Sequence, residues 1–392
     1  MHFLCPRILA IVRRLLALVS AIIFVDALLF TALTPLIPVY ADEYDLSKAE
    51  AGLLVGAYGA GALLGGIPGG LAASRFGPKR AVIGGLILLS VSSFAFAAAD
   101  SALALGGARF VQGIASTATW AGALAWISAT APRERRGEAI GTAFGAAIFG
   151  AILGPAFGGV ADLVSIEAAF TIVGLVALAF AALASVARSA HPETASLAGL
   201  RRAFRDQRFL GGLWLNMLPA MLFGLLIVLT PLALDDAGWS TFGIAAVFFG
   251  SGLVEVVLNP LLGRYSDRVG RLLPIRVGLT ASVVVALALA ASSEAAIIAA
   301  LVCAAGISFG SLYTPSMSLT SHRAETAGLA QGLAFGVMNT AWALGELVGP
   351  SAGGALADSA GDSAPYLVGA TLCALTLAAT YRVAGRVRPH AA

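Results

Sequence analysis

The sequence predicts an all-α membrane protein of twelve transmembrane helices, arranged as two six-helix bundles related by pseudo-two-fold symmetry. Of its 392 residues, 59% are hydrophobic and only 11% are charged, whereas a soluble domain carries about 25% charged residues. Apolar stretches long enough to cross a hydrocarbon layer of about 30 Å recur along the whole chain. Two sequence patterns also occur twice, once in each half of the chain.

The apolar stretches define the predicted spans. Lipid offers no partner to backbone groups, so continuous stretches of this length favour helices over barrel strands. The first stretch follows several Arg residues, as in a signal peptide, but it is too long for a signal core and no small-x-small cleavage site closes it. The predicted spans are residues 15–39, 50–72, 81–99, 102–127, 138–160, 164–187, 209–233, 241–262, 274–292, 295–319, 329–356 and 364–384.

The loops between these spans carry charge unevenly. With the N-terminus in the cytoplasm, 22 of the 24 Lys and Arg residues fall on the cytoplasmic side, while Lys48 lies outside and Arg109 lies within a span. Cytoplasmic loops retain positive charge, so the sequence predicts a multi-pass protein of a cell inner (cytoplasmic) membrane with both termini cytoplasmic. The opposite loops carry Asp42, Glu43, Asp45, Asp100, Asp162, Asp235, Asp236, Asp358 and Asp362.

A polar stretch at residues 188–208 separates the two halves. It contains Pro192 and five Arg residues. We predict an N-terminal six-helix bundle at 1–187, a cytoplasmic linker at 188–208 with the composition of an amphipathic helix, and a C-terminal six-helix bundle at 209–392.

A glycine–proline pattern of nineteen residues occurs in spans five and eleven, with its second copy 195 residues after the first. Close packing of membrane helices explains glycines in general, but it does not explain two copies in the same register. Because Gly154-Pro155 and Gly349-Pro350 interrupt helical hydrogen bonds and let backbones approach, we expect these two pairs to form flexible contacts between spans five and eight, and between spans eleven and two. The pattern includes Gly150, Gly154 and Pro155, then Gly345, Gly349 and Pro350.

A shorter pattern of glycines and charged residues follows spans two and eight, in copies 193 residues apart. The two repeats together indicate that the halves derive from one duplicated unit, which is how many secondary transporters are built. The first copy contains Gly70, Arg75, Gly77 and Arg80, and the second contains Gly263, Asp267, Arg268 and Gly270.

These patterns resemble the major facilitator superfamily over the whole chain. The loop pattern resembles its cytoplasmic gating motif, and the glycine–proline pattern resembles that of its drug:proton antiporter branch with twelve spans. Arg109, Gln112 and Gly113 resemble the R-xx-Q-G element of that branch, which implies a role in proton coupling. Asp26, ahead of a T-xxx-P-xx-P segment, resembles bacterial multidrug and vesicular amine transporters.

Two positions depart from the resemblance. Ser74 stands where the first loop motif has Asp, although Asp267 keeps that acid in the second copy. Asn339 stands in span eleven where vesicular amine transporters have Asp. The resemblance therefore does not imply that this chain transports an amine.

Asp26, Arg109, Glu255 and Glu346 are charged residues deep inside predicted spans. Each charge costs roughly 2.5–3.5 kcal/mol at the bilayer centre, so it must face a cavity or a partner. Asp26 is the candidate for carrying a proton or meeting a cationic substrate, with a structural cap of neighbouring helix ends as the alternative. Arg109 couples proton transfer to a nearby acid or forms a buried ion pair that only orients helices.

The two buried Glu residues lie on polar helix faces. Glu255 is one turn from Asn259, and this stripe serves either the substrate or an interhelix hydrogen bond. Glu346 shares a face with Asn339 and Trp342, which suggests a substrate wall made of an aromatic surface, an amide and an acid.

The expected function is secondary active transport: proton-coupled efflux of small amphipathic or drug-like molecules by alternating access. The expected partners are a small-molecule substrate, protons and the lipid bilayer, with the chain acting as a monomer and with no nucleic acid, cofactor or metal. Enzymatic activity is not expected, because no nucleophile–base set or phosphate loop is present. The alternatives are a permease of the same fold that imports or facilitates a nutrient such as a sugar or amino acid, and a non-transporting membrane receptor or scaffold.

Overall fold

The computed structural model describes residues 6–132, 135–189, 197–269, 272–329 and 331–385, and all regular structure in these ranges is helical. Every predicted span coincides with a helix or with consecutive helical segments. The elements are α1 (Pro6–Ala32), η1 (Thr34–Leu36), α2 (Ile37–Tyr44), α3 (Lys48–Phe76), α4 (Pro78–Ala97), α5 (Ala102–Thr130), α6 (Arg136–Val164), α7 (Ile166–Val186), α8 (Leu197–Ala203), α9 (Gln207–Asp236), α10 (Thr241–Val269), α11 (Leu272–Ala291), α12 (Ala295–Gly310), α13 (Tyr313–Thr326), α14 (Gln331–Ala360) and α15 (Ser363–Gly385).

Two spans are broken helices. Span one consists of α1, η1 and α2, and the break contains Pro35 and Pro38, which have no backbone N–H to continue the helical ladder. Span ten consists of α12 and α13, separated by Ser311 and Leu312, and Pro315 lies in the first turn of α13. The predicted linker contains the short helix α8.

Nine helical segments of the described chain are long and apolar enough to cross a bilayer. The long helices that fall outside this group are α5 and α14, which carry Arg109 and Glu346, respectively. The described side chains of α10, Thr241–Val256, form a shorter apolar stretch. Asp26 lies in the segment with the highest mean hydropathy, Val12–Tyr44.

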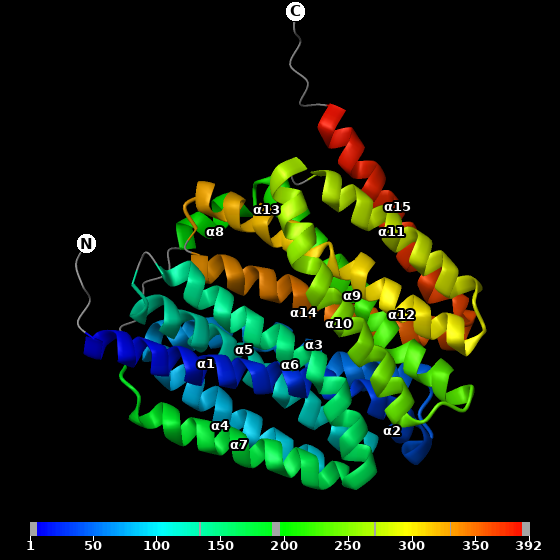
Figure 1. Cartoon of the computed structure of the whole chain (residues 1–392), viewed down its shortest axis with the longest axis horizontal. Coiled ribbons are helices and arrows are strands. Elements are labelled where there is room, and N and C mark those ends of the chain that lie inside the picture. The colour runs from blue at the N-terminus through cyan, green and yellow to red at the C-terminus, as the bar shows by residue number, and fades with distance from the viewer. Residues whose placement is uncertain (1–5, 133–134, 190–196, 270–271, 330, 386–392) are drawn as a thin grey trace, which may run out of the picture.

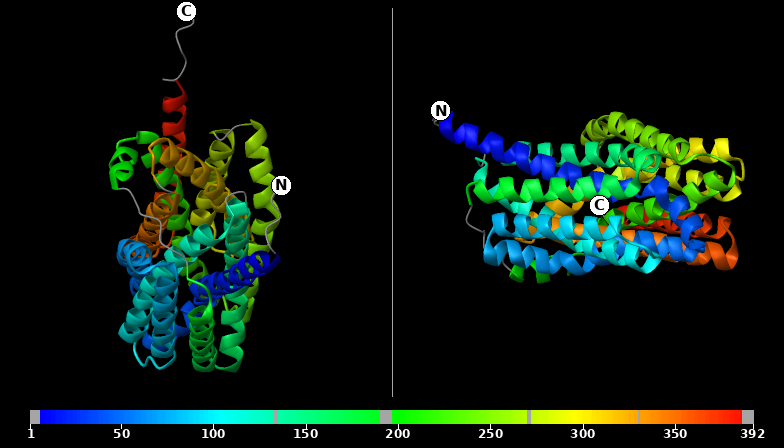
Figure 2. Two further views of the ribbon diagram at one scale, coloured as in Figure 1. Left: turned by 90° about the vertical axis from the view of Figure 1, so that its left-hand side faces the viewer. Right: turned by 90° about the horizontal axis from the view of Figure 1, so that it is seen from below.

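The helices pack in two groups (Figures 1 and 2). Helices α1–α7 pack mainly on one another through the pairs α3–α5, α1–α6, α4–α5 and α4–α7. Helices α9–α15 do the same through α9–α14, α11–α15, α10–α12 and α9–α13. The main contacts between the groups are α3 with α14 and α6 with α10, which we call the α3–α14 seam and the α6–α10 seam.

A basic residue makes an equivalent contact in each group. Lys79, at the start of α4, donates to the carbonyls of Ser185 at 2.5 Å and Ala187 at 2.8 Å, at the end of α7. Arg276, near the start of α11, donates to the carbonyl of Thr380 at 3.0 Å, near the end of α15. Ser185 and Ala187 lie at the very end of α7, where carbonyls lack helical partners and interact favourably with cations, whereas Thr380 lies five residues before the end of α15.

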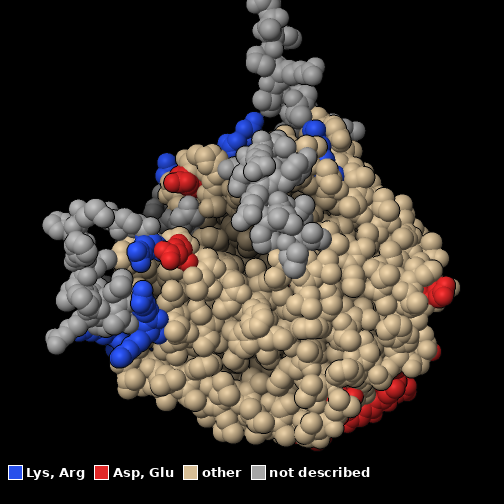
Figure 3. All heavy atoms as spheres, viewed as in Figure 1, with Lys and Arg blue, Asp and Glu red and all other residues tan. Residues whose placement is uncertain are grey.

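Charge divides the molecule into two ends (Figure 3). One end, where α3 ends and α4 begins, carries Arg75, Lys79 and Arg80, and we call it the basic end. We call the acidic end the opposite one, where α3 begins and α14 ends, with Asp358 and Asp362 close to Lys48. The two ends match the two sides predicted from the loops, and which end faces the cytoplasm stays a prediction.

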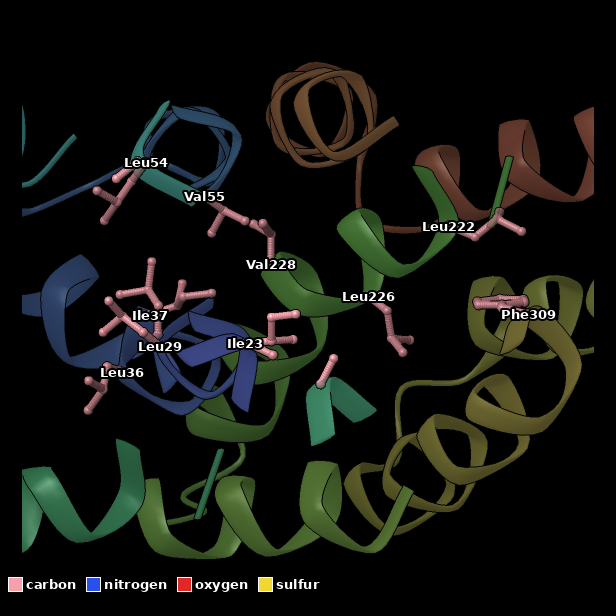
Figure 4. Packing of buried hydrophobic residues seen from close by; sticks show 14 of the residues in the cluster. Ile23, Leu29, Leu36, Ile37, Leu54, Val55, Leu222, Leu226, Val228 and Phe309 are labelled. Atoms are coloured by element: carbon pink, nitrogen blue, oxygen red, sulfur yellow. The ribbon is translucent and has the colours of Figure 1, made fainter. Parts of the chain in front are cut away.

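The buried apolar residues form one large cluster that extends across both groups. Figure 4 shows Val55 of α3 directed toward Val228 of α9, with Ile23 of α1 and Leu226 of α9 also at the contact. Close van der Waals packing of this kind is what holds helices together in lipid, where apolar burial alone supplies little.

Candidate functional site

Glycines bring α3 and α5 into backbone contact. A Cβ on Gly61 would overlap the carbonyl of Phe110, and a Cβ on Gly113 would overlap the carbonyl of Tyr58. Small residues let membrane helices approach this closely. As a result, the ring of Tyr58 lies beside Arg109, with 4.8 Å between the guanidinium carbon and the ring centroid.

The opposite side of α3 meets α14 in the same way. A Cβ on Gly59 would stand 2.6 Å from the backbone nitrogen of Leu347 and 2.7 Å from the carbonyl carbon of Glu346. Helix α3 therefore holds α5 on one face and α14 on another. This arrangement brings acids and bases from distant parts of the chain to one level of the molecule.

Asp26 is held by two donors from α5. Its side chain is 3% exposed. The hydroxyl of Ser116 donates to its Oδ2 at 2.7 Å, and the indole N–H of Trp120 donates to the same atom at 2.8 Å. Hydrogen bonds to an ionised group are about twice as strong as neutral ones, so these two support a carboxylate that has little access to water.

Arg109 is 1% exposed and is held by carbonyl groups. It donates to the backbone oxygens of Leu29 at 3.4 Å and Phe30 at 3.2 Å, and to the side-chain oxygen of Gln112 at 3.1 Å. Its charge interacts with the carboxylates of Asp26 and Glu346. Among the described residues, no ion pair within 4.0 Å includes Arg109, so its charge interacts with both acids without a direct ion pair to either.

Glu346 retains unused hydrogen-bonding capacity. Its side chain is 3% exposed, and its Oε2 has no hydrogen-bond partner in the described part of the chain. The same is true of Nε of Arg109 and Nε2 of Gln112. Buried polar atoms are nearly always paired. Oε2 of Glu346 can therefore take up a proton or accept from a water molecule or ligand, whereas the two nitrogens can donate to a water molecule or to an acceptor of a ligand.

Aromatic rings from five helices form two groups of contacts around these polar residues. The ring centroid of Phe30 in α1 is 4.9 Å from that of Tyr58 in α3 and 5.3 Å from that of Trp342 in α14. The ring of Trp120 is 5.4 Å from that of Phe144 in α6. Such surfaces bind flat apolar groups and cations.

We call the assembled residues the central cluster. It unites four predicted site residues with three side chains that the sequence interpretation did not assign to the site. Asn339 is half-buried on α14 and takes no part in the contacts of the cluster. The members are Asp26, Tyr58, Arg109, Gln112, Ser116, Trp120 and Glu346.

A helical spacing could have identified two of the missed members. Trp120 and Ser116 follow Arg109 and Gln112 at intervals of three or four residues, which place all four on one face of α5. Tyr58 could not be identified from residue spacing, because its place in the cluster depends on which helices pack against the glycines of α3.

Glu255 lies apart from the central cluster. It is half-buried in α10 and approaches the break in span ten, where a Cβ on Gly310 would stand 2.6 Å from its Oε1. The hydroxyl of Tyr313 interacts electrostatically with both Glu255 and Glu346. Asn259, predicted to share its stripe, has a side chain outside the described residues.

In the first copy of the loop pattern, the backbone conformation explains why one position is glycine. Gly77 joins α3 to α4 with φ of +91°, a conformation that residues with a side chain rarely adopt. Gly70 faces open space, and Arg75 and Arg80 are exposed at the basic end. For the second copy, the side chains of Asp267 and Arg268, together with Gly263 and Gly270, lie outside the part of the structure that can be described.

The glycine–proline pattern in α6 faces a different helix from the one expected. A Cβ on Gly150 would overlap the carbonyl of Phe24, and a Cβ on Gly154 would stand 2.5 Å from that of Leu28. Both contacts are with α1, in the same group. The expected contact with span eight is therefore wrong for Gly154.

The second copy repeats this geometry. Gly345 faces Met217 and Gly349 faces Met221, both in α9, so the expected contact with span two is wrong for Gly349. Met217 and Met221 lie 193 residues after Phe24 and Leu28. The two copies thus pack against equivalent points of α1 and α9.

Contacts between the groups fall on the remaining positions of the pattern. Pro350 offers its carbonyl to Gly52 of α3, and Gly354 meets the carbonyl of Lys48. In α6, Gly159 meets Ala245 of α10. Pro155 is buried within α6.

Comparison with known proteins gives a consistent answer. The family model of the Major Facilitator Superfamily matches residues 19–335. Multidrug resistance protein 2 of Bacillus subtilis (strain 168) is 26% identical over 354 residues, which are 86% of this chain and 87% of that protein. Quinolone resistance protein NorA of Staphylococcus aureus (strain COL) is 25% identical over 354 residues, covering 88% and 90% of the two chains.

Solved structures show the same fold. A bacterial homolog to the human lysosomal transporter Spinster, in an inward-facing and unoccupied conformation, aligns with a TM-score of 0.79 at 16% identity, covering 96% of this chain and 97% of that chain. The same homolog in an inward-facing and occupied conformation aligns with a TM-score of 0.75 at 18% identity. The predicted all-α fold of twelve spans is confirmed.

Proposed function

The chain belongs to the Major Facilitator Superfamily and is a multi-pass membrane transporter, and we propose that it exports small amphipathic molecules in exchange for protons. The observation that carries this proposal is the central cluster, in which the charge of one arginine interacts with two buried carboxylates. Asp26 comes from α1 and Glu346 from α14, so the acids belong to the two helix groups.

The charge balance of the cluster favours exchange. With both acids ionised and Arg109 protonated, the three side chains carry a formal charge of −1. One proton or one cationic group of a substrate neutralises this charge, and burial penalises any charge left unbalanced. A proton and a cationic substrate therefore compete for one site, and this competition is the simplest basis for antiport.

The aromatic rings around the cluster favour amphipathic substrates. Phe30 contacts the rings of both Tyr58 and Trp342, and the ring of Tyr58 lies against the guanidinium of Arg109. The printed names of two relatives, a multidrug resistance protein and a quinolone resistance protein, support a substrate of this kind. We propose that the rings bind the apolar body of the substrate while its polar group meets the unpartnered atoms of Glu346, Gln112 or Arg109.

We further propose that the protein lies in a bacterial inner membrane with the basic end and both termini in the cytoplasm, and that it acts as a monomer. Retention of positive charge on the cytoplasmic side supports this orientation. Substrate is then released at the acidic end, where protons enter.

Flux in vesicles tests the proposal. The purified protein is reconstituted, a pH gradient is imposed, and movement of ethidium, a fluorescent amphipathic cation, is followed. Asp26→Asn and Glu346→Gln should each lower gradient-driven flux by at least about tenfold, a factor that corresponds to about 1.4 kcal/mol. The matched control is Glu138→Gln, which removes an exposed acid at the first turn of α6 and should leave flux unchanged.

The direction of proton movement separates the alternatives. Ethidium flux that ignores the gradient in the parent protein would refute proton coupling. Protons that move in the same direction as substrate would instead favour a permease that imports a nutrient.

A further inference from the structure

The acidic end of the α3–α14 seam is closed by a carboxylate bound to the start of a helix. Oδ1 of Asp358, near the end of α14, accepts from the backbone N–H of Lys48 at 3.2 Å. Its Oδ2 accepts from the backbone N–H of Ala49 at 2.8 Å. We propose that Asp358 is a latch that holds the acidic end of the transporter shut and must be released before that end opens.

The start of α3 leaves those two donors free for Asp358. The first N–H groups of a helix have no partner within it. Here Ser47 and Glu50 satisfy each other: the Ser47 hydroxyl accepts from the N–H of Glu50 at 3.3 Å, and the Glu50 carboxylate accepts from the N–H of Ser47 at 2.9 Å. The remaining N–H groups, of Lys48 and Ala49, are the ones that Asp358 binds, and the helix dipole favours an anion at this position.

Two further contacts belong to the latch. Lys48 Nζ lies 2.6 Å from Oδ1 of Asp362, in an ion pair whose side chains are 31% and 58% exposed. An ion pair this exposed contributes little by itself. Gly354 allows the approach, since a Cβ at this position would overlap the carbonyl of Lys48.

The α6–α10 seam closes differently. Gly159 of α6 packs on Ala245, and Gly252 of α10 packs on Ile152, both through apolar groups. The start of α10 is bound by its own Ser240, whose hydroxyl accepts from the N–H of Gly243 at 3.2 Å. Among the described residues, no carboxylate of α6 hydrogen bonds to the start of α10. The latch is therefore confined to one of the two seams.

This inference rests on the alternating opening and on the orientation in the proposed function, which places the acidic end outside the cell, but on neither the proton nor the direction of transport. Its test therefore measures opening directly. Ser351 of α14 is suited to report it, because its hydroxyl is buried in the seam beneath the latch, against Gly56 of α3. Ser351→Cys is introduced after Cys5, Cys303 and Cys373 have been replaced by Ser, and intact spheroplasts are treated with a maleimide that does not cross membranes.

We expect Asp358→Asn to raise the labelling rate of Ser351→Cys at least about fivefold, because an amide binds the two N–H groups more weakly than a carboxylate. Asp362→Asn should raise the rate by less than about threefold. The control is Asp236→Asn, an exposed acid at the same end, which should leave the rate unchanged. About 0.5 M salt should raise the rate of the parent protein but not that of Asp358→Asn.

A second variant removes the other side of the contact. Ala49→Pro deletes one of the two N–H donors at a position in the first helical turn where proline is tolerated. It should raise labelling like Asp358→Asn. If both variants reach the membrane at parental amounts and label at the parental rate, the latch is refuted, whereas the antiport proposal would stand or fall by the flux assay alone.

Discussion

The glycines of the repeated pattern are not equivalent, and alanine substitution should separate them. In α14, a Cβ on Gly336 would meet nothing within 4 Å, whereas a Cβ on Gly349 would stand 2.8 Å from Cα of Met221 and 2.9 Å from its carbonyl carbon. A Cβ on Gly349 would also overlap the carbonyl oxygen of Met221. Ordinary contacts begin at 3.4 Å, so Gly349→Ala must push α14 and α9 apart by at least about 0.6 Å to clear the Cα of Met221, and further to clear its carbonyl oxygen. All three partners are backbone atoms, so no side-chain rotation can relieve the contact.

The two substitutions should therefore change the free energy of unfolding in opposite directions. Alanine is favoured over glycine in a helix interior by about 1 kcal/mol. Gly336→Ala should stabilise the protein by this amount, because the added Cβ meets no other atom within 4 Å. Overpacking costs about 1–3 kcal/mol, and more where backbone must move, so Gly349→Ala should be destabilising by about 1–2 kcal/mol after the same gain.

Thermal unfolding of the purified protein measures this difference. Gly336→Ala should raise the midpoint relative to the parent, and Gly349→Ala should lower it. Gly353→Ala offers an internal check, because its contact is Cδ2 of Leu225, the end of a flexible side chain, so Leu225→Ala should rescue it. Replacing Met221 by Ala should not rescue Gly349→Ala. A Gly349→Ala protein at least as stable as the parent would refute the packing argument.

Two further predictions concern side chains that donate hydrogen bonds. Trp120→Phe keeps an aromatic ring beside Phe144 but removes one hydrogen bond to Asp26, worth about 1.5–3 kcal/mol. This change should shift the pH profile of gradient-driven flux. The control is Trp214→Phe, whose indole donates to Thr376 at 2.9 Å and which should leave the pH profile unchanged. Lys79→Met removes the cation from the end of α7 and should lower the unfolding midpoint, as Arg276→Met should at the equivalent place, whereas the same change at the exposed Arg80 should not.

The sequence by itself determined the class of the protein. Apolar stretches, loop charges and two repeats are local or periodic features, and lipid leaves a chain of this composition little choice but helices. The same reasoning identified Asp26, Arg109, Gln112 and Glu346, because a charge or amide within an apolar stretch is visible without any structure. The breaks in spans one and ten also have local causes in their prolines.

Only the tertiary structure decided which of these residues meet. The glycines of α3 admit α5 on one face and α14 on another, and this brings Tyr58 to Arg109 and Glu346 to the same level, a result that no spacing along the chain specifies. The same dependence explains why Gly154 and Gly349 were assigned to the wrong neighbours, whereas Pro350 does meet α3 as expected. A glycine signals that some backbone approaches, but the partner is set by how the helices pack.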